Sequence, residues 1–285
     1  MNNPRFLALA ALGLVGMVTT AHAAVLHGDW WYAIDAQNDG SGGSVYEARG
    51  LAYKVDGDRL VFAFSTMLGL GGHAHGGVRN GLINNGDLFL NFTGTNLTSA
   101  AAFQQPGVFG IRFDGANDSL GNQGGTNTAI GLYSNLSVGT FATNNNGWAS
   151  LQAYINAGFG RSQKAMGDLQ STALDVVPYL GNGQILANIT QGTAIGGITP
   201  LSRAQLTGID FAHFAADPSG NHVFGFSVDR NLLPTGDFKA HFFEECGNDG
   251  AAIMGNNPVP EPGTLMALAV GAVGLLRRRL RRNRA

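Results

Sequence analysis

Cysteine is almost absent from this sequence of 285 residues, which contains a single one, Cys246. One cysteine excludes an intramolecular disulfide, so stability must come from a hydrophobic core or from a bound ion. The sequence also lacks a nucleophile elbow, a phosphate-binding glycine loop and a zinc-protease helix motif. Because no catalytic motif is present, we expect a protein that is not an enzyme.

Basic residues are scarce between residues 24 and 260, where ten Lys and Arg stand against eighteen Asp and Glu, a formal charge of −8. This segment lacks the basic stripe that nucleic-acid binding requires, and its charge would repel anionic lipid. We therefore predict no nucleic-acid partner. An acidic composition suits a soluble extracellular protein and one that binds divalent cations.

The first 23 residues are typical of a secretory signal peptide. Arg5 provides a positive start, Phe6 to Val18 form an uncharged apolar core, and Ala21-His22-Ala23 offers a small-residue cleavage site. The alternative, an uncleaved anchor, is disfavoured because the apolar core is too short to span a bilayer. We predict cleavage between Ala23 and Ala24 and export through the inner membrane.

The segment 258–285 has three parts in order. Val259-Pro260-Glu261-Pro262 comes first, an uncharged run from Leu265 to Leu276 follows, and six arginines lie after it: Arg277, Arg278, Arg279, Arg281, Arg282 and Arg284. The arginines should stay cytoplasmic and stop transfer. A spanning helix needs roughly 20 apolar residues, so the short run predicts a segment that the membrane holds only transiently.

This order of parts resembles the PEP-CTERM sorting signal. The resemblance implies processing near Val259 to Pro262 by exosortase, a membrane-embedded cysteine protease of Gram-negative bacteria that make extracellular polysaccharide. It also implies delivery to the cell surface or secretion into an extracellular matrix. The alternative is an ordinary C-terminal anchor. Four stretches resemble a family of exosortase-dependent surface proteins, and the resemblance covers most of residues 29–262 and implies no catalytic residues: Trp30 to Asp35, Asn38 to Glu47, Gly86 to Phe92 and Ala240 to Asp249.

Residues 24–257 have the many turn-forming residues that are typical of an all-β domain, since glycine is abundant and Asn and Thr recur between short apolar stretches. Alternate residues place strongly apolar side chains on one face over four stretches, which predicts strands: Arg59–Thr66, Asp87–Thr93, Phe224–Asp229 and Phe238–Phe243. Shorter candidates are Trp30–Ile34, Val45–Val55, Val108–Phe113, Gln184–Ile189 and Ile209–Phe214. This spacing predicts a β-sandwich or a jelly roll, with loops or short helices at Gly158–Asp175 and Ser202–Leu206.

One loop has the residue types of a calcium site. From Asp35 to Ser41, oxygen-bearing side chains including Asp35 and Asp39 stand at alternate positions before a glycine, and Glu47 follows as a candidate bidentate ligand. Glu47 falls one position away from the glutamate of an EF-hand loop, and Asn-Asp-Gly is also a good turn. Calcium is thus the single cofactor that the sequence suggests, and a plain turn is the alternative.

Two other groups invite a chemical interpretation. His73 and His75 would point to one side of an extended chain, as two metal ligands could, but no third ligand is evident and a solvent-exposed loop is the favoured reading. Cys246 lies near His241, Glu244 and Glu245 in the sequence, which suggests a cysteine nucleophile; a buried structural cysteine is the simpler interpretation.

The function that the sequence favours is structural or adhesive work in a polysaccharide envelope. The first alternative is a lectin-like module, because aromatic side chains could form a platform for a sugar ring or could simply fill the core: Trp30, Trp31, Tyr32 and Trp148. The second alternative is a polysaccharide-acting enzyme. Extracellular polysaccharide is accordingly an expected partner, beside exosortase.

Overall fold

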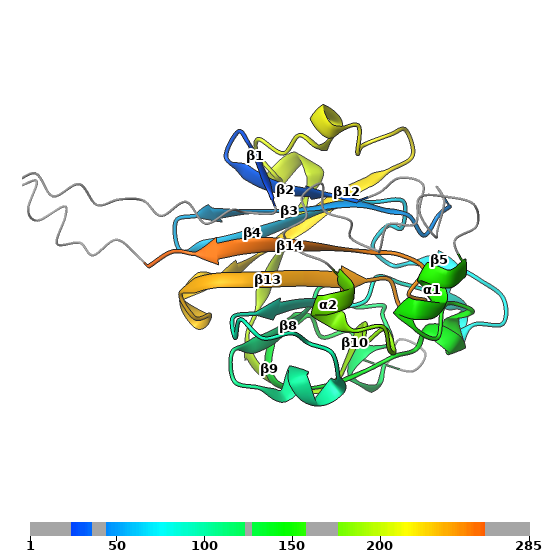
Figure 1. Cartoon of the computed structure of the whole chain (residues 1–285). Helices are drawn as coiled ribbons and strands as arrows, with labels where there is room; N and C mark the ends of the chain where they lie inside the picture. The colour runs from blue at the N-terminus through cyan, green and yellow to red at the C-terminus, as the bar shows by residue number, and fades with distance from the viewer. Residues whose placement is uncertain (1–23, 36–43, 123–126, 158–175, 260–285) are drawn as a thin grey trace, which may run out of the picture.

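The fold consists of two six-stranded sheets whose pairings are antiparallel throughout the described chain. The structure, a computed structural model, describes residues 24–35, 44–122, 127–157 and 176–259 (Figure 1). The first sheet has the order β1-β2-β3-β4-β12-β11 and the second β10-β9-β8-β7-β13-β14. The all-β prediction is confirmed, and the two sheets form a sandwich.

The strands of the first sheet are β1 (Val25–His27), β2 (Trp30–Ile34), β3 (Ala48–Asp56), β4 (Arg59–Thr66), β12 (His222–Asp229) and β11 (Ile198–Ser202). Those of the second are β10 (Asn188–Gly196), β9 (Gly131–Gly139), β8 (Val108–Arg112), β7 (Leu88–Asn91), β13 (Gly236–Phe243) and β14 (Gly250–Asn257). A small separate hairpin pairs β5 (His73–Ala74) with β6 (Leu82–Ile83).

Phenylalanine rings from both sheets fill the space between them. The Phe64 ring of β4 stacks on Phe113 at 4.6 Å between centroids and meets Phe242 of β13 edge-on at 5.0 Å. Phe62 of β4 meets Phe238 of β13 at 6.1 Å. Burying one such ring contributes about 1.5–3 kcal/mol, so these contacts hold the sheets face to face.

A second, smaller hydrophobic layer covers the outer face of the first sheet. Trp30 and Tyr32 point to that face, where Leu206 and Phe211 from the β11–β12 connection pack on them. The connection contains the 3-10 helices η5 (Arg203–Gln205) and η6 (Phe211–Phe214). In Figure 1 the yellow connection lies over the blue strands β1 and β2. Both faces of β2 are therefore packed.

Helices are few and short in the described chain. The α-helices are α1 (Leu151–Ala157) and α2 (Val176–Leu180), and the remaining 3-10 helices are η1 (Arg79–Gly81), η2 (Ala100–Gln104), η3 (Ser119–Gly121), η4 (Ala142–Asn145) and η7 (Arg230–Leu232). No helix among the described residues is long and apolar enough to cross a membrane. The apolar run Leu265 to Leu276 lies outside the described residues.

The strand predictions are confirmed where alternation was strongest. β2 and β4 have the predicted bounds, and β7, β8, β12 and β13 lie at the predicted places. Two predictions were partly wrong. The strand predicted at Val45–Val55 begins only at Ala48, because residues 45–47 form a turn in which the Glu47 amide donates to Ser44 O at 3.1 Å. The strand predicted at Gln184–Ile189 begins only at Asn188, because Ile185 and Ala187 pack in the cluster beneath α1.

The predicted strand Ile209–Phe214 is wrong. Asp210 instead caps η6, since its carboxylate accepts a hydrogen bond from the His213 amide at 3.1 Å. That local hydrogen bond competes with strand formation at an aspartate. The predicted loop or short helix at Ser202–Leu206 is η5 with a capping box between Ser202 and Gln205, and Gly158–Asp175 lies outside the described residues.

Candidate functional site

The turn between β13 and β14 is a deeply buried polar segment. Its residues Glu244, Glu245, Cys246 and Asp249 are each 0% exposed. The Glu244 amide donates to Asp249 O at 3.0 Å, and the Glu245 amide donates to Asn84 O, also at 3.0 Å. These hydrogen bonds hold the turn against the end of the sandwich. Cys246, the candidate nucleophile suggested by the sequence, lies in this turn.

A glycine lets a neighbouring loop approach this turn. A Cβ atom on Gly147 would lie 1.7 Å from the carbonyl oxygen of Cys246, so only glycine fits there. The next amide, that of Trp148, donates to the same carbonyl at 3.0 Å. The loop after η4 therefore covers Cys246 and closes the turn against solvent.

Amide donors surround the Glu245 carboxyl group. Its oxygens accept from the Asp118 amide and from Asn188 Nδ2, the latter at 2.8 Å, and from the Asn84 amide at 3.2 Å. Burial nevertheless raises the pKa of Glu245 to about 8, with the nearby Asp118 adding to the rise and the donors opposing it. The side chain thus ties the β13–β14 turn to two neighbouring loops.

Asp87, just before β7, also ties separate segments together through its buried carboxyl group. It accepts from Ser119 Oγ and from the Ile189 amide at 2.6 Å each, and from Asn117 Nδ2 at 2.8 Å. Burial raises its pKa to about 6, while these hydrogen bonds and the charge of Arg112 act in the opposite direction. The fully buried Arg112 donates in turn to Asn117 Oδ1 at 2.8 Å.

Cys246 and His241 each make their side-chain hydrogen bond to another partner. The Cys246 thiol donates to Glu244 Oε2 at 3.7 Å, and burial raises the pKa of the thiol well above its usual range, so the thiolate is disfavoured. The His241 ring pairs through Nδ1 with Tyr179 Oη at 3.3 Å and stacks on Phe89. Burial lowers the pKa of His241 to about 3. The geometry supports a structural cysteine.

The predicted calcium ligands fall partly on this end of the sandwich. Asp35 and Glu47 are buried, at 4% and 0% exposure, and Asp39 lies outside the described residues. The pKa of Glu244 is raised mainly by burial, then by the charge of Asp249, and also by the charge of the nearby Glu47. Asp249 Oδ2 also accepts from the Ala48 amide at 2.7 Å. The structure thus brings Glu244 near Glu47 although the two lie 197 positions apart in the sequence, and calcium binding stays a prediction.

The two histidines of the glycine-rich loop lie in the small hairpin. His73 pairs with Ile83 in β5–β6 and meets the Tyr46 ring edge-on at 5.9 Å, and His75 is exposed. Within the described ranges, no cluster of three metal-ligating side chains includes either of them.

The four predicted sugar-binding aromatics are not on one surface. Trp30 and Tyr32 are buried in the outer layer, with Trp30 Nε1 donating to Thr207 O at 2.9 Å. Trp31 points to the opposite face of β2, and Trp148 packs against Tyr154 at 6.5 Å. Only Trp31 and Trp148 keep part of their surface open to solvent.

The sorting segment starts where the last strand stops. β14 ends at Asn257, the Pro258 carbonyl accepts a hydrogen bond from the Arg230 guanidinium, and Val259 is 70% exposed. A model of the PEP-CTERM protein-sorting motif matches residues 258–282. This chain carries a PEP-CTERM sorting signal. The exosortase resemblance is thereby supported at the level of the motif.

The PEP-CTERM match covers the predicted processing element and most of the basic end. Pro260, Glu261 and Pro262, like Arg277 to Arg282 and Ala23, lie outside the described residues, whereas Ala24 is the first described residue and is buried. Comparison with curated proteins and with solved structures gives no match. The motif indicates export and sorting to the surface or the extracellular space through exosortase.

Proposed function

We propose that this protein is a structural or adhesive component of a polysaccharide envelope, to which its PEP-CTERM signal directs it. The observation that carries the proposal is the position of the motif, which begins at residue 258, directly after the last strand of the sandwich. The sorting segment is thus joined to a folded domain with no intervening linker. An exosortase acting near Val259 would leave a complete two-sheet body as its product.

The junction between domain and signal is firmly held. Arg230 Nε donates to Asn257 Oδ1 at 2.9 Å, and Asn257 Nδ2 donates to Pro234 O, also at 2.9 Å. Upstream of this clamp, β14 pairs with β13 from Asn257 back to Gly250. Tension on the C-terminal end therefore acts on a complete antiparallel ladder. Such a junction suits a protein that bears load at its point of attachment.

The buried carboxyl groups also support a structural role. Asp87 and Glu245 are fully enclosed and accept hydrogen bonds from the loops that they join. A carboxyl pair that hydrolyses a glycoside must face a cleft in which the sugar can lie. These two face hydrogen-bond donors of the protein itself.

Retention on cells tests the proposal. The protein is expressed in a strain that makes the extracellular polysaccharide and in an otherwise identical strain that does not, and the cell-bound and released fractions are measured by immunoblot. We expect the protein to stay with the first strain and to be released by the second. A variant with alanine at 260–262 serves as the control for sorting. Equal retention in both strains would contradict an envelope role.

The lectin alternative is favoured by one groove. A surface groove of about 340 Å³ is lined by Asp29, Trp31, Tyr53, Val55, Asn256 and Pro258. An aromatic side chain beside carboxylate and amide groups is a common arrangement for binding sugars. A glycan array with the exported protein distinguishes the two functions. Binding that disappears in Trp31→Ala but not in Trp148→Ala would favour the lectin.

A further inference from the structure

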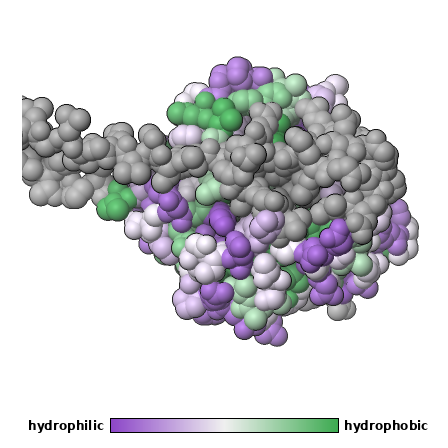
Figure 2. Space-filling model, in the orientation of Figure 1, coloured by the Kyte–Doolittle hydropathy of each residue, from purple (hydrophilic) through white to green (hydrophobic). Residues whose placement is uncertain are grey.

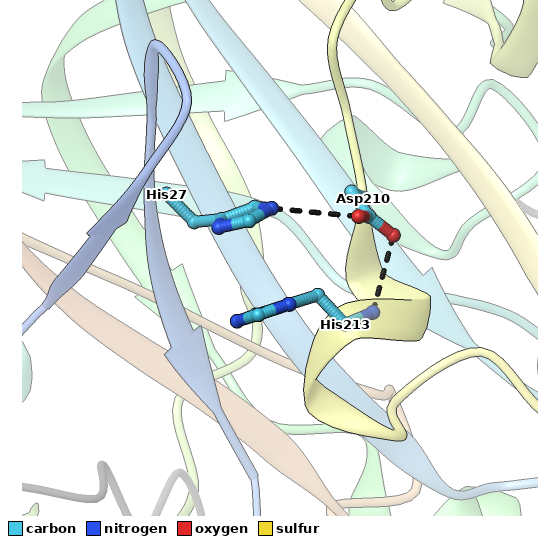
Figure 3. Close-up of side chains that lie close together, drawn as sticks. All are labelled: His27, Asp210 and His213. Carbon is cyan, nitrogen blue, oxygen red and sulfur yellow. Dashed lines mark hydrogen bonds and ion pairs between the residues drawn. The ribbon is translucent and has the colours of Figure 1, made fainter.

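Two histidines and an aspartate meet on the outer layer of the first sheet, although they lie far apart in the sequence. His27 is the last residue of β1, Asp210 caps η6 and His213 lies within η6, in the connection between β11 and β12. Figure 3 shows the two imidazole rings lying nearly parallel, with the Asp210 carboxylate at one end of them. None of the three takes part in the core or in the sorting segment.

The ligand atoms of these side chains converge. His27 Nε2 lies 3.4 Å from Asp210 Oδ2, and the two imidazole rings stack with centroids 3.9 Å apart at 11°. One ligand atom from each residue lies within 4.8 Å of the others, and within the described part of the chain this is the one such trio of His, Cys, Asp or Glu side chains. Ligands of a tetrahedral zinc ion lie roughly 3.4 Å apart, given bonds of about 2.0–2.1 Å. The lone pairs of an imidazole lie in the plane of its ring, and the two ring planes are nearly parallel, so the exposed His213 ring must turn out of the stack for both nitrogens to face one ion.

Two aromatic residues, of which Tyr32 is buried and Phe214 partly buried, hold the trio in place. Tyr32, buried on β2, accepts a hydrogen bond through Oη from the Asp210 amide at 2.8 Å. The Phe214 ring meets His213 edge-on at 4.8 Å and His27 edge-on at 5.8 Å. His27 is fixed from the other side by its pairing with Trp30. The three residues are therefore held close together before any ion arrives, and the His213 ring alone has to turn, which limits the entropy cost of binding.

The nearby cations are engaged with other carboxylates. Arg203 forms an ion pair with Asp217 at 2.5 Å, and Lys54 forms one with Asp29 at 2.8 Å. The Asp210 carboxylate is about half exposed and faces His27. The Asp210 carboxylate thus lies beside two stacked imidazoles, with no competing lysine or arginine ion pair to it among the described residues.

We propose that His27, Asp210 and His213 bind a divalent transition-metal ion such as Zn²⁺ at the surface of the first sheet. Neutral imidazole nitrogen and carboxylate oxygen are the donors that zinc uses, whereas calcium and magnesium prefer oxygen alone. Three protein ligands leave a fourth position open toward solvent. The site joins β1 to η6, so an ion there would fasten the first strand to the outer layer. This inference goes beyond the envelope role and does not depend on it.

Calorimetric titration of the purified full chain with ZnCl₂ tests the site. The chain is kept in mild detergent and carries an affinity tag without histidine, because a polyhistidine tag would bind the probe itself. We expect one equivalent of zinc to be lost, or its Kd to rise at least tenfold, in His27→Gln, His213→Gln and Asp210→Asn. Asparagine at 210 keeps an oxygen that can cap η6, so the fold is retained while the charged ligand is removed.

Two controls give the result its meaning. His75→Gln, which changes an exposed histidine outside the trio, should bind zinc like the wild type. A millimolar excess of CaCl₂ should not displace the zinc. Identical zinc binding in the wild type and all three ligand variants, or no saturable binding in the wild type, would overturn the proposal. Because His213 is exposed, its variant keeps the test decisive even if another variant folds poorly.

Discussion

Stability should fall as the pH rises from 5 to 8, because buried carboxyl groups are protonated in the folded protein. Burial raises the pKa of Glu245 from its ordinary 4.5 to about 8 and that of Asp87 from 3.8 to about 6. Between the two pKa values of each group the folded state binds more protons than the unfolded state, so the free energy of unfolding decreases with pH. Glu244, whose pKa burial raises well above its ordinary value, acts in the same direction.

The size of the effect follows from these pKa values. Between pH 5 and pH 8 the loss is about 3.5 kcal/mol for Glu245 and about 1.5 kcal/mol for Asp87. His241 opposes them: its pKa falls from 6.5 to about 3 on folding, so stability rises by about 2 kcal/mol over the same window. The net change is a loss of about 3 kcal/mol, a large part of the 5–15 kcal/mol typical of a domain.

Urea unfolding of the purified chain, followed by tryptophan fluorescence at pH 5, 6, 7 and 8, measures this slope. Glu245→Gln is neutral at every pH and should remove most of the decline. Asp58→Asn, in the exposed turn between β3 and β4, should leave the slope unchanged. A free energy of unfolding that rises steadily from pH 5 to pH 8, or a Glu245→Gln profile equal to the wild type, would refute the reasoning.

Three further outcomes are expected. Phe64→Ala should lower the free energy of unfolding by about 3–5 kcal/mol in the same urea assay, because the ring is fully buried between the sheets, and Leu232→Ala at the surface should cost far less. Alanine at 260–262 should leave an unprocessed chain in the inner membrane. Neutral residues in place of the six arginines should let the uncleaved tail pass through the inner membrane. Mass spectrometry of the C-terminus in each cell fraction distinguishes the two outcomes. If the loop from Asp35 to Glu47 binds calcium, the Tm should rise with calcium and fall with chelator. The free energy of unfolding should increase by about 2.7 kcal/mol at a hundredfold excess of calcium over Kd, and Asp39→Ala should remove the response.

Much of this fold is readable in the sequence, because alternate residues of a strand lie on opposite faces and the face that meets the other sheet must be strongly apolar. β4 and β13 show that alternation, and they were predicted in place. β14 was missed because its sequence, GAAIMGNN, is rich in small residues and lacks clear alternation. The reason is visible only in the folded chain: a Cβ atom on Gly255 would lie 2.3 Å from the Phe238 ring of the neighbouring strand, so the ring occupies the space that a side chain would need.

The sequence by itself determined where the protein is sorted, since the PEP-CTERM signal is a continuous segment at residues 258–282 whose parts act in order along the chain. It also determined the class of fold, through a period of two. Only the tertiary structure decided which polar groups meet. His27 reaches Asp210 across 183 positions, and Glu47 lies near Glu244 across 197, because antiparallel pairing and the outer layer bring distant segments together. No local pattern encodes such contacts, since each residue's immediate neighbours are those of an ordinary turn or strand end.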